Sequence, residues 1–363
     1  MISARFEFFS LLRCSPLLKC VIFSYLFPFC CRFFEIIQEM SNEKSLLTPS
    51  ITDAISSYFS IGPLIHEPRV VSIDKINQVW EIETKKGRFA LKRVSTKRLY
   101  EETEKIARYF QQAKLPVITA LKGIYQHGPY YFQLFEWVEG KVMSVDEILP
   151  QQAEKIGSLL FNFHQMNLTP SQFDLTILND LFYDYPFNKA EWVRAVDMAC
   201  ALKINSSDKL QSLLPELIAV SEESREATAR LKPSRLISHR DIGPQNVIWN
   251  SDDDPVIIDW ELAGLIPPTV EVLGSAFDWS VVRHDKIDDS RYNALLQGYQ
   301  QAGGSMSQVP LAFAALMGTW LSWLLVNLQR FIAGKCPDRA EKEVIQTLLT
   351  FEEVYCKGRY LGG

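Results

Sequence analysis

Three polar residues that could bind a cation or move a proton lie close together between Ser238 and Glu261. Asp241 and Asn246 belong to the stretch "SHRDIGPQN", and Asp259 ends the apolar run "VIID" that follows it. An ionised carboxylate among apolar residues requires a cation or a hydrogen-bond network to stabilise it. This stretch is therefore the first candidate for a chemical site.

The segment between Asn246 and Asp259 has the pattern of a β-hairpin. Two short apolar runs, "NVIW" and "PVIID", flank the turn-rich tract "NSDDD". Closing the hairpin brings its two outer ends together, about 4.8 Å apart, which places Asn246 beside Asp259. An amide oxygen and a carboxylate at that spacing are hard ligands that suit Mg²⁺. Asp241 lies in the preceding loop, where it is free to face a substrate hydroxyl.

The composition is that of an ordinary globular protein. The chain has 363 residues, of which 47% are hydrophobic and 22% charged, enough for two domains or lobes with real cores. A formal net charge of −5 gives no basic field, so neither nucleic acid nor an anionic membrane is the expected partner. The seven cysteines include no C-x-x-C pair, which indicates reduced thiols without a metal site of their own.

Residues 1–39 differ from the rest in being apolar and aromatic. The uncharged run Cys20–Cys31 is shorter than the roughly 20 residues that a membrane-spanning helix needs, and Pro28 interrupts it. No small-residue cleavage site follows. We expect a dispensable extension outside the fold, with an anchor or targeting segment as the alternative, and a first domain that begins at Met40.

The predicted secondary structure changes from mainly β to mainly helical near Gly140. Residues 40–139 contain short β-like runs at 69–73, 78–84, 88–94 and 130–138, interrupted by one helical pattern at 100–113. Beyond Gly140 helical patterns dominate, at 145–166, 216–231 and 309–332. The sequence predicts an α+β protein of two lobes, a small and mainly antiparallel β lobe at 40–139 and a larger helical lobe at 140–363.

The pattern His239-x-Asp241-x-x-x-x-Asn246, followed by Ile258-Asp259-Trp260-Glu261, resembles the catalytic segment of the aminoglycoside phosphotransferase and choline kinase-like family. The intervals of five and thirteen residues between Asp241, Asn246 and Asp259 are also those of protein kinases. The resemblance extends from about residue 40 to about residue 334. It implies a protein kinase-like fold and an enzyme that transfers the γ-phosphoryl group of ATP or GTP to a hydroxyl of a small molecule. The need for nucleotide and Mg²⁺ leads us to expect a cytoplasmic location.

The same resemblance assigns roles to individual residues. It makes Asp241 the catalytic base and gives Mg²⁺ to Asn246 and Asp259. Lys92, in "RFALKRV", occupies the position of the family's phosphate-binding lysine. Its carboxylate partner is Glu102, which has the better helical phase, or Glu104, whose distance from the end of the helix also fits.

The nucleotide loop departs from the glycine-rich pattern. Residues 72–83 contain no glycine, so the phosphate-binding candidates there are Asn77 and Gln78. The strand "QLFEWVEG" resembles the hinge that presents backbone groups to adenine, from Phe135 to Trp137, with Gly140 permitting the turn that follows.

Structural roles account for several other conspicuous residues. His239 and Arg240 are interpreted as supports for the loop, and His164 as a core histidine with satisfied hydrogen bonds. The sequence is equally compatible with two roles for Glu261, which are contact with the metal and structural support of its loop. Four tryptophans are assigned to the core: Trp260, Trp279, Trp320 and Trp323.

One stretch of the sequence is a candidate for binding the acceptor. Residues 178–192 combine aromatic and acidic side chains, which fits helix packing around a loop or, less favoured, a wall for a cationic acceptor. Two other functions compete with a small-molecule kinase. A protein kinase would have Asp-Phe-Gly where this chain has Asp259-Trp-Glu, and a non-catalytic nucleotide-binding regulator would not need Asp241, Asn246, Asp259 and Lys92 together.

Overall fold

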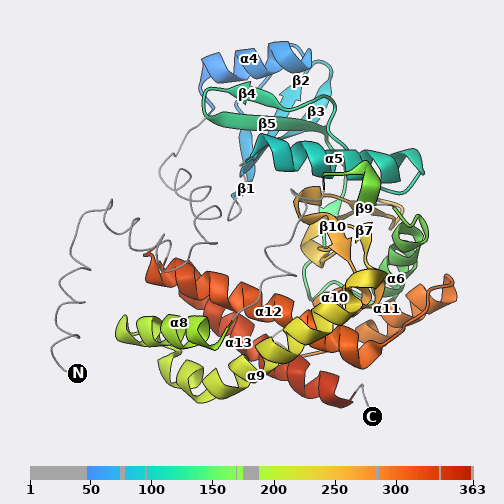
Figure 1. Ribbon diagram of the computed structural model, residues 1–363. Coiled ribbons are helices and arrows are strands. Elements are labelled where there is room, and N and C mark those ends of the chain that lie inside the picture. Colours follow the sequence, from blue (N-terminus) through green and yellow to red (C-terminus); the bar gives the residue numbers. More distant parts are fainter. Residues whose placement is uncertain are drawn as a thin grey trace. The chain divides into compact units, whose positions relative to one another are not determined.

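The structure is a computed structural model that describes residues 47–73, 78–94, 96–168, 170–174, 188–282, 286–334 and 337–360. The chain divides into two compact units, coloured along the sequence in Figure 1. The first contains the residues up to Lys97 together with 120–137, and the second contains 98–119 and the residues from Val138 onward. The helical segment that follows the third predicted strand therefore groups with the larger unit.

The first unit is built on an antiparallel sheet with the strand order β1-β2-β3-β5-β4. All four predicted β runs are strands in it. The elements of this unit are α4 (Pro49–Phe59), β1 (Arg69–Ile73), β2 (Gln78–Thr84), β3 (Gly87–Val94), β4 (Tyr125–His127) and β5 (Tyr130–Glu136).

Helix α4 packs on one face of this sheet and encloses the core of the unit (Figure 1). The Thr48 hydroxyl caps the helix by accepting a hydrogen bond from the backbone N–H of Ile51, and Pro49 occupies the first turn. Phe89 and Leu91 of β3 belong to this core. Because side chains alternate across a strand, Lys92 extends from the opposite face of the sheet.

The second unit is mainly helical and contains two small antiparallel sheets, β6-β8-β9 and β10-β7. Its larger elements are α5 (Lys97–Gln112), β6 (Lys141–Val142), α6 (Pro150–Gln165), α8 (Lys189–Ala201), α9 (Ser207–Leu231), β7 (Leu236–Ser238), β8 (Val247–Trp249), β9 (Pro255–Ile257), β10 (Gly264–Ile266), α10 (Pro268–Ser280), α11 (Asp289–Gln301), α12 (Val309–Ile332) and α13 (Pro337–Tyr360).

Helix α9 begins earlier than the sequence pattern indicates. The prediction of a helix from Glu216 is wrong at its first residue, because α9 begins at Ser207 and continues through Pro215. Proline removes one backbone donor from a helix. Pro215 and Gln211 are both exposed, so water can solvate the carbonyl group that loses its partner.

Helices α6 and α11 cross at very short distance because a glycine lies on each side of the contact. A Cβ atom on Gly157 would lie 2.0 Å from the carbonyl oxygen of Leu295, and one on Gly298 would lie 2.1 Å from that of Glu154. The Ser158 hydroxyl donates to the carbonyl of Gly298 at 3.1 Å. This crossing fixes the helix that carries His164.

Helix α12 has the bounds that the sequence predicts. It is long and apolar enough to cross a membrane, but 56% of its most apolar window is buried within the protein. It packs against α8, α9, α10 and α13. These contacts make it a core helix of the second unit.

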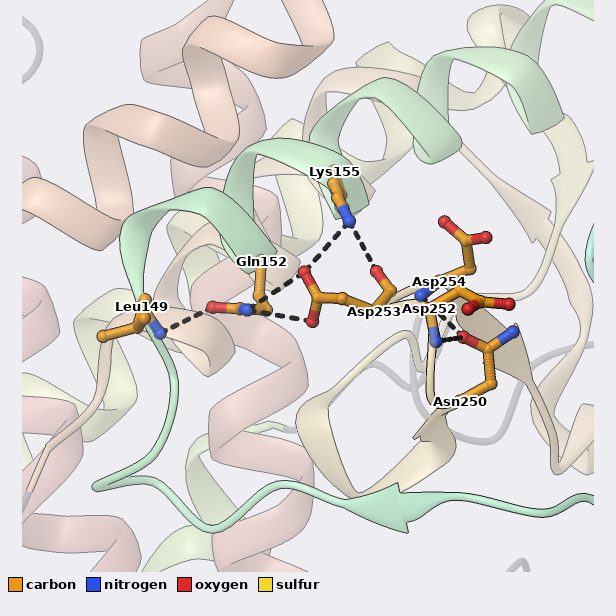
Figure 2. A network of polar contacts seen from close by, with 7 residues as sticks. All are labelled: Leu149, Gln152, Lys155, Asn250, Asp252, Asp253 and Asp254. Carbon is orange, nitrogen blue, oxygen red and sulfur yellow. Dashed lines mark hydrogen bonds and ion pairs between the residues drawn. The ribbon is translucent and has the colours of Figure 1, made fainter.

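The turn of the β8–β9 hairpin is attached to the beginning of α6 (Figure 2). The Asp253 carboxylate accepts hydrogen bonds from the Gln152 amide at 3.1 Å and from the Lys155 ammonium at 3.0 Å. The Asn250 side chain accepts from the backbone N–H groups of Asp252 and Asp254, at 3.0 and 2.9 Å. The hairpin that carries Asn246 and Asp259 is thereby held at the end remote from those two residues.

Candidate active site

The β8–β9 hairpin brings Asn246 next to Asp259, as the sequence predicts. Val247 pairs with Ile257, and the backbone N–H of Ile258 donates to the carbonyl of Asn246 at 3.0 Å. Asn246 thus lies directly before β8, and Asp259 lies two residues after β9.

The Asn246 amide is oriented by Asp241. Its Nδ2 group donates to the Asp241 carboxylate and to the Asp241 backbone carbonyl, at 2.8 Å in each case. An amide has one oxygen and one nitrogen, so committing the nitrogen to Asp241 leaves Oδ1 as the group available to a cation. The pair therefore presents a carboxylate and a separate amide oxygen.

His239 supports this loop from within the core. It is fully buried and packs edge-on against Trp260, with ring centroids 4.6 Å apart. Its Nε2 group donates to the carbonyl of Ile258 at 3.0 Å, and its Nδ1 atom accepts from the backbone N–H of Asp241 at 3.2 Å. Burial lowers the pKa of His239 to about 4, so the ring is neutral at pH 7 and acts as a support.

Glu271 of α10 is a buried acid that sequence reasoning missed. One of its oxygens accepts from the backbone N–H of Arg240 at 2.6 Å, and the other contacts His164 Nε2 at 2.6 Å. Burial would raise the pKa of Glu271, but the hydrogen bonds with His164 and the Arg240 N–H hold it below its usual value. The sequence signal is an acidic residue, one of two, in a mostly apolar helix.

His164 is a core histidine, as predicted. It is buried, and besides Glu271 its Nδ1 atom contacts the Tyr299 hydroxyl at 3.0 Å. Through Glu271 it connects α6 to the backbone that precedes Asp241.

Two residues of the site adopt left-handed backbone conformations. Arg240 has φ 69° and Asp259 has φ 64° and ψ 68°. Non-glycine residues are strained in this region, and such strain persists only where neighbouring contacts fix the chain. For Asp259 those contacts include the packing of the Trp260 ring against Phe110 and Phe163, at centroid distances of 5.4 and 5.7 Å.

Asp278 is a second acid that the sequence did not single out. It lies on α10, next to Trp279, whose indole N–H donates to the carbonyl of Ile242 at 2.7 Å. Burial raises the pKa of Asp278 to about 7. The pKa of Asp241 is raised well above its usual value. Burial is the largest cause, and the negative charges of Asp278 and Asp259 are the next largest. Asp241 is therefore a stronger base than an exposed aspartate.

The first unit presents Lys92 and the expected hinge on one strand pair. Lys92 is buried, with 8% of its surface exposed, and lies opposite Gln133 of β5. Ala90 lies opposite Phe135 on the same face. The backbone N–H of Trp137 donates to the Arg88 carbonyl at 3.1 Å, and the Arg88 guanidinium lies 4.7 Å from the centre of the Trp137 ring.

Gly140 lies in the second unit at a close approach to β8. It has φ 157°, and a Cβ atom there would lie 2.3 Å from the carbonyl oxygen of Trp249. Only glycine fits, in accord with the expected turn after the hinge.

The two candidate partners of Lys92 differ in their surroundings on α5. Glu102 is buried; its carboxylate pairs with Lys105 and accepts from the backbone N–H of Asp174 at 3.3 Å. Glu104 forms an ion pair with Arg108 at 2.9 Å. The helical phase that the sequence assigns to Glu102 agrees with its burial, which it shares with Ile106 and Phe110 of the same helix.

Several predicted features lie outside the described residues. These are Asn77 of the nucleotide loop, the extension at residues 1–39 and most of the aromatic and acidic stretch, at 178–187. Gln78 is the first residue of β2.

The oxygen atoms of Asn246 and Asp259 suit Mg²⁺ better than a cation whose ligands must all come from protein side chains. Among the described residues no group of three or more His, Cys, Asp or Glu side chains could hold a metal ion. Mg²⁺ is commonly bound by one or two carboxylates, with water and substrate phosphates completing its shell. The Asp259 carboxylate and the Asn246 amide oxygen fit that description.

The model of the phosphotransferase enzyme family APH matches residues 67–309. No curated protein matches at a significant level.

Three solved structures illustrate the similarity. Spectinomycin phosphotransferase APH(9)-Ia, in complex with ADP and spectinomycin, has a TM-score of 0.65 and 12% identity, with 86% of this chain and 98% of that chain covered. An ethanolamine kinase from Plasmodium vivax has a TM-score of 0.56 and 13% identity, with 85% and 89% covered. APH(2")-IIia, in complex with GDP and kanamycin, has a TM-score of 0.57 and 13% identity, with 85% and 99% covered. The predicted α+β kinase-like fold is confirmed.

Proposed function

Since the chain belongs to the APH family of phosphotransferases, we propose that it transfers the γ-phosphoryl group of ATP or GTP to a hydroxyl of a small molecule. The observation that carries the proposal is the arrangement of Asp241, Asn246 and Asp259 around one hairpin, with Asp241 hydrogen-bonded to Asn246 at 2.8 Å. Similar structures with bound ADP and GDP support a nucleotide as phosphoryl donor.

In the proposed reaction, Asp241 accepts the proton of the acceptor hydroxyl. The hydroxyl oxygen attacks the γ-phosphorus, the bond to the β–γ bridging oxygen breaks, and the nucleoside diphosphate leaves. The raised pKa of Asp241 suits a residue that must take up a proton. Asn246 Nδ2 keeps the Asp241 carboxylate in place throughout.

Each unit contributes its own candidates for binding the nucleotide. Asn246 Oδ1 and the Asp259 carboxylate would hold Mg²⁺, which supplies charge neutralisation at the phosphates. Lys92 is assigned to the phosphates and the backbone from Phe135 to Trp137 to the base. The acceptor is a small metabolite or an aminoglycoside-like molecule, and the proposed location is the cytoplasm.

The test is nucleotide turnover by the full chain with Mg²⁺ and either ATP or GTP. Acceptors are offered as pools of amino sugars, amino alcohols and hydroxy amino acids, and a protein and peptide pool is offered separately. Asp241→Asn is compared with Asp252→Asn, a matched change at an exposed turn residue of the same unit. We expect acceptor-dependent turnover that Asp241→Asn abolishes and Asp252→Asn retains.

Two outcomes would contradict the proposal. Phosphorylation of a protein or peptide pool alone would make the chain a protein kinase. Mg²⁺-dependent nucleotide binding without turnover on any pool would favour the non-catalytic regulator.

A further inference from the structure

Glu261, two residues beyond Asp259, is engaged by a residue far away in the sequence. The Tyr100 hydroxyl donates to Glu261 Oε2 at 2.7 Å. Tyr100 lies on α5 with only 4% of its surface exposed, and Glu261 lies in the short 3₁₀ turn at Trp260–Leu262. A phenol hydrogen bond to a carboxylate in such surroundings is stronger than one between neutral groups.

The turn is held at each of its three residues. The Trp260 ring packs against Phe110 of α5, the Glu261 carboxylate accepts from Tyr100, and the Leu262 carbonyl accepts from the Arg240 guanidinium. The turn begins directly after Asp259, whose left-handed backbone needs external contacts to persist. Contacts on the turn therefore act on the orientation of the Asp259 carboxylate.

Helix α5 supplies two of these three contacts. Tyr100 and Phe110 lie ten residues apart on the same helix, so they fix the turn at two separate points. Phe110 provides apolar packing, which resists displacement but does not specify the rotation of the turn. The Tyr100 hydrogen bond is directional and supplies that specification.

We propose that Glu261 is a positioning residue that, held by Tyr100, keeps Asp259 in the conformation that binds Mg²⁺, and that Glu261 is not itself a metal ligand. This inference rests on the proposed function, because it concerns the cation of the same site. Residues that orient metal ligands commonly change metal affinity by 10- to 100-fold when they are removed.

The two possible roles of Glu261 predict opposite effects for two conservative variants. Tyr100→Phe removes the donor and leaves the Glu261 carboxylate intact. Glu261→Gln removes the charge but keeps an oxygen that can accept from Tyr100. A positioning role is sensitive to the first change, and a ligand role is sensitive to the second.

The measurement is binding of a fluorescent ADP analogue to the full chain across a Mg²⁺ titration, without acceptor. We expect Tyr100→Phe to raise the Mg²⁺ concentration for half-maximal binding about tenfold, and Glu261→Gln to remain within about twofold of the wild type. Tyr109→Phe is the matched control, because Tyr109 is a half-buried tyrosine of the same helix. Turnover against Mg²⁺ concentration should show the same order.

A second comparison guards against a general loss of structure in Tyr100→Phe. Glu261→Ala removes the acceptor of the same hydrogen bond, so it should resemble Tyr100→Phe, and the double variant should be no worse than either single one. Additive losses in the double variant would overturn the proposal.

The remaining outcomes are equally decisive. A large effect of Glu261→Gln with a silent Tyr100→Phe would make Glu261 a ligand, and no effect of either would remove it from the site. Failure of the wild type to bind nucleotide in a Mg²⁺-dependent way would instead defeat the proposed function.

Discussion

One nitrogen of Asn246 contacts Asp241 twice, at 2.8 Å from both the side-chain carboxylate and the backbone carbonyl. Asn246 therefore has two functions in the proposed site. It fixes the base through Nδ2 and offers Oδ1 to the cation.

Replacing Asn246 separates these functions. Asn246→Ala removes both, and we expect turnover to fall by roughly 10²- to 10⁴-fold, the range for loss of an oriented base. Asn246→Asp keeps a ligand oxygen but places a second negative charge beside Asp241, which raises the pKa of Asp241 further. Its activity should therefore recover as the pH is raised, whereas that of Asn246→Ala should not. Gln245→Ala, at the exposed neighbouring position, is the control.

Removing the charge of Asp278 should extend activity to lower pH. Its negative charge contributes to the raised pKa of Asp241, which must be ionised to accept a proton. Asp278→Asn lowers the pKa of Asp241, so the acidic limb of the kcat/KM profile moves to lower pH. Asp252→Asn should leave the limb in place. An unchanged limb in Asp278→Asn would contradict this prediction, because it would show that Asp278 carries no effective negative charge at the pH of the limb.

Glu271→Gln should lower stability in a pH-dependent way. The folded-state pKa of Glu271 lies below its ordinary value of 4.5, so its ionised form stabilises the fold above that pH. This contribution is lost as the pH falls through the folded-state pKa. We expect a loss of about 3 kcal/mol at pH 7, as for other broken buried pairs, and a smaller difference from the wild type below pH 4.5. Urea unfolding followed by circular dichroism measures both. A pH-independent difference would contradict this account.

The α6–α11 crossing should not tolerate a methyl group. Gly157→Ala would place a Cβ atom 2.0 Å from a backbone oxygen, so the helices must separate, at a cost of about 1–3 kcal/mol. Gly274→Ala is a matched change in α10, where the nearest atom is the end of the Leu316 side chain at 3.2 Å. Alanine is favoured over glycine within a helix by about 1 kcal/mol, so this variant should be neutral or more stable. Thermal unfolding distinguishes them, and equal stabilities would refute the steric argument.

Local patterns accounted for much of the fold. The β8–β9 hairpin and α12 follow from strand alternation, turn residues and an unbroken apolar run, all of which act over short distances in the sequence. The extension of α9 through Pro215 could not be read locally, because a proline in a helix is tolerated only where the surroundings permit it.

Some residues of the candidate site could likewise be predicted from the sequence, and others could not. Asp241, Asn246 and Asp259 are recognisable by their spacing in one short stretch of sequence, a loop followed by a hairpin. Glu271, Asp278 and Tyr100 are not, because their roles depend on contacts such as that between Tyr100 and Glu261, 161 residues apart. No local pattern encodes such a distance.

The backbone of Asp259 has a consequence for interpreting divergent copies of this fold. Aspartate and asparagine adopt left-handed φ and ψ at lower cost than other side-chain-bearing residues, and glycine adopts them freely, so chemistry and conformation restrict this position independently. A descendant that no longer needs the carboxylate would still need a residue of that small set. Asparagine or glycine at position 259 would then mark a chain that has given up phosphoryl transfer while keeping its fold, whereas a β-branched residue there would mark one whose loop has been rebuilt.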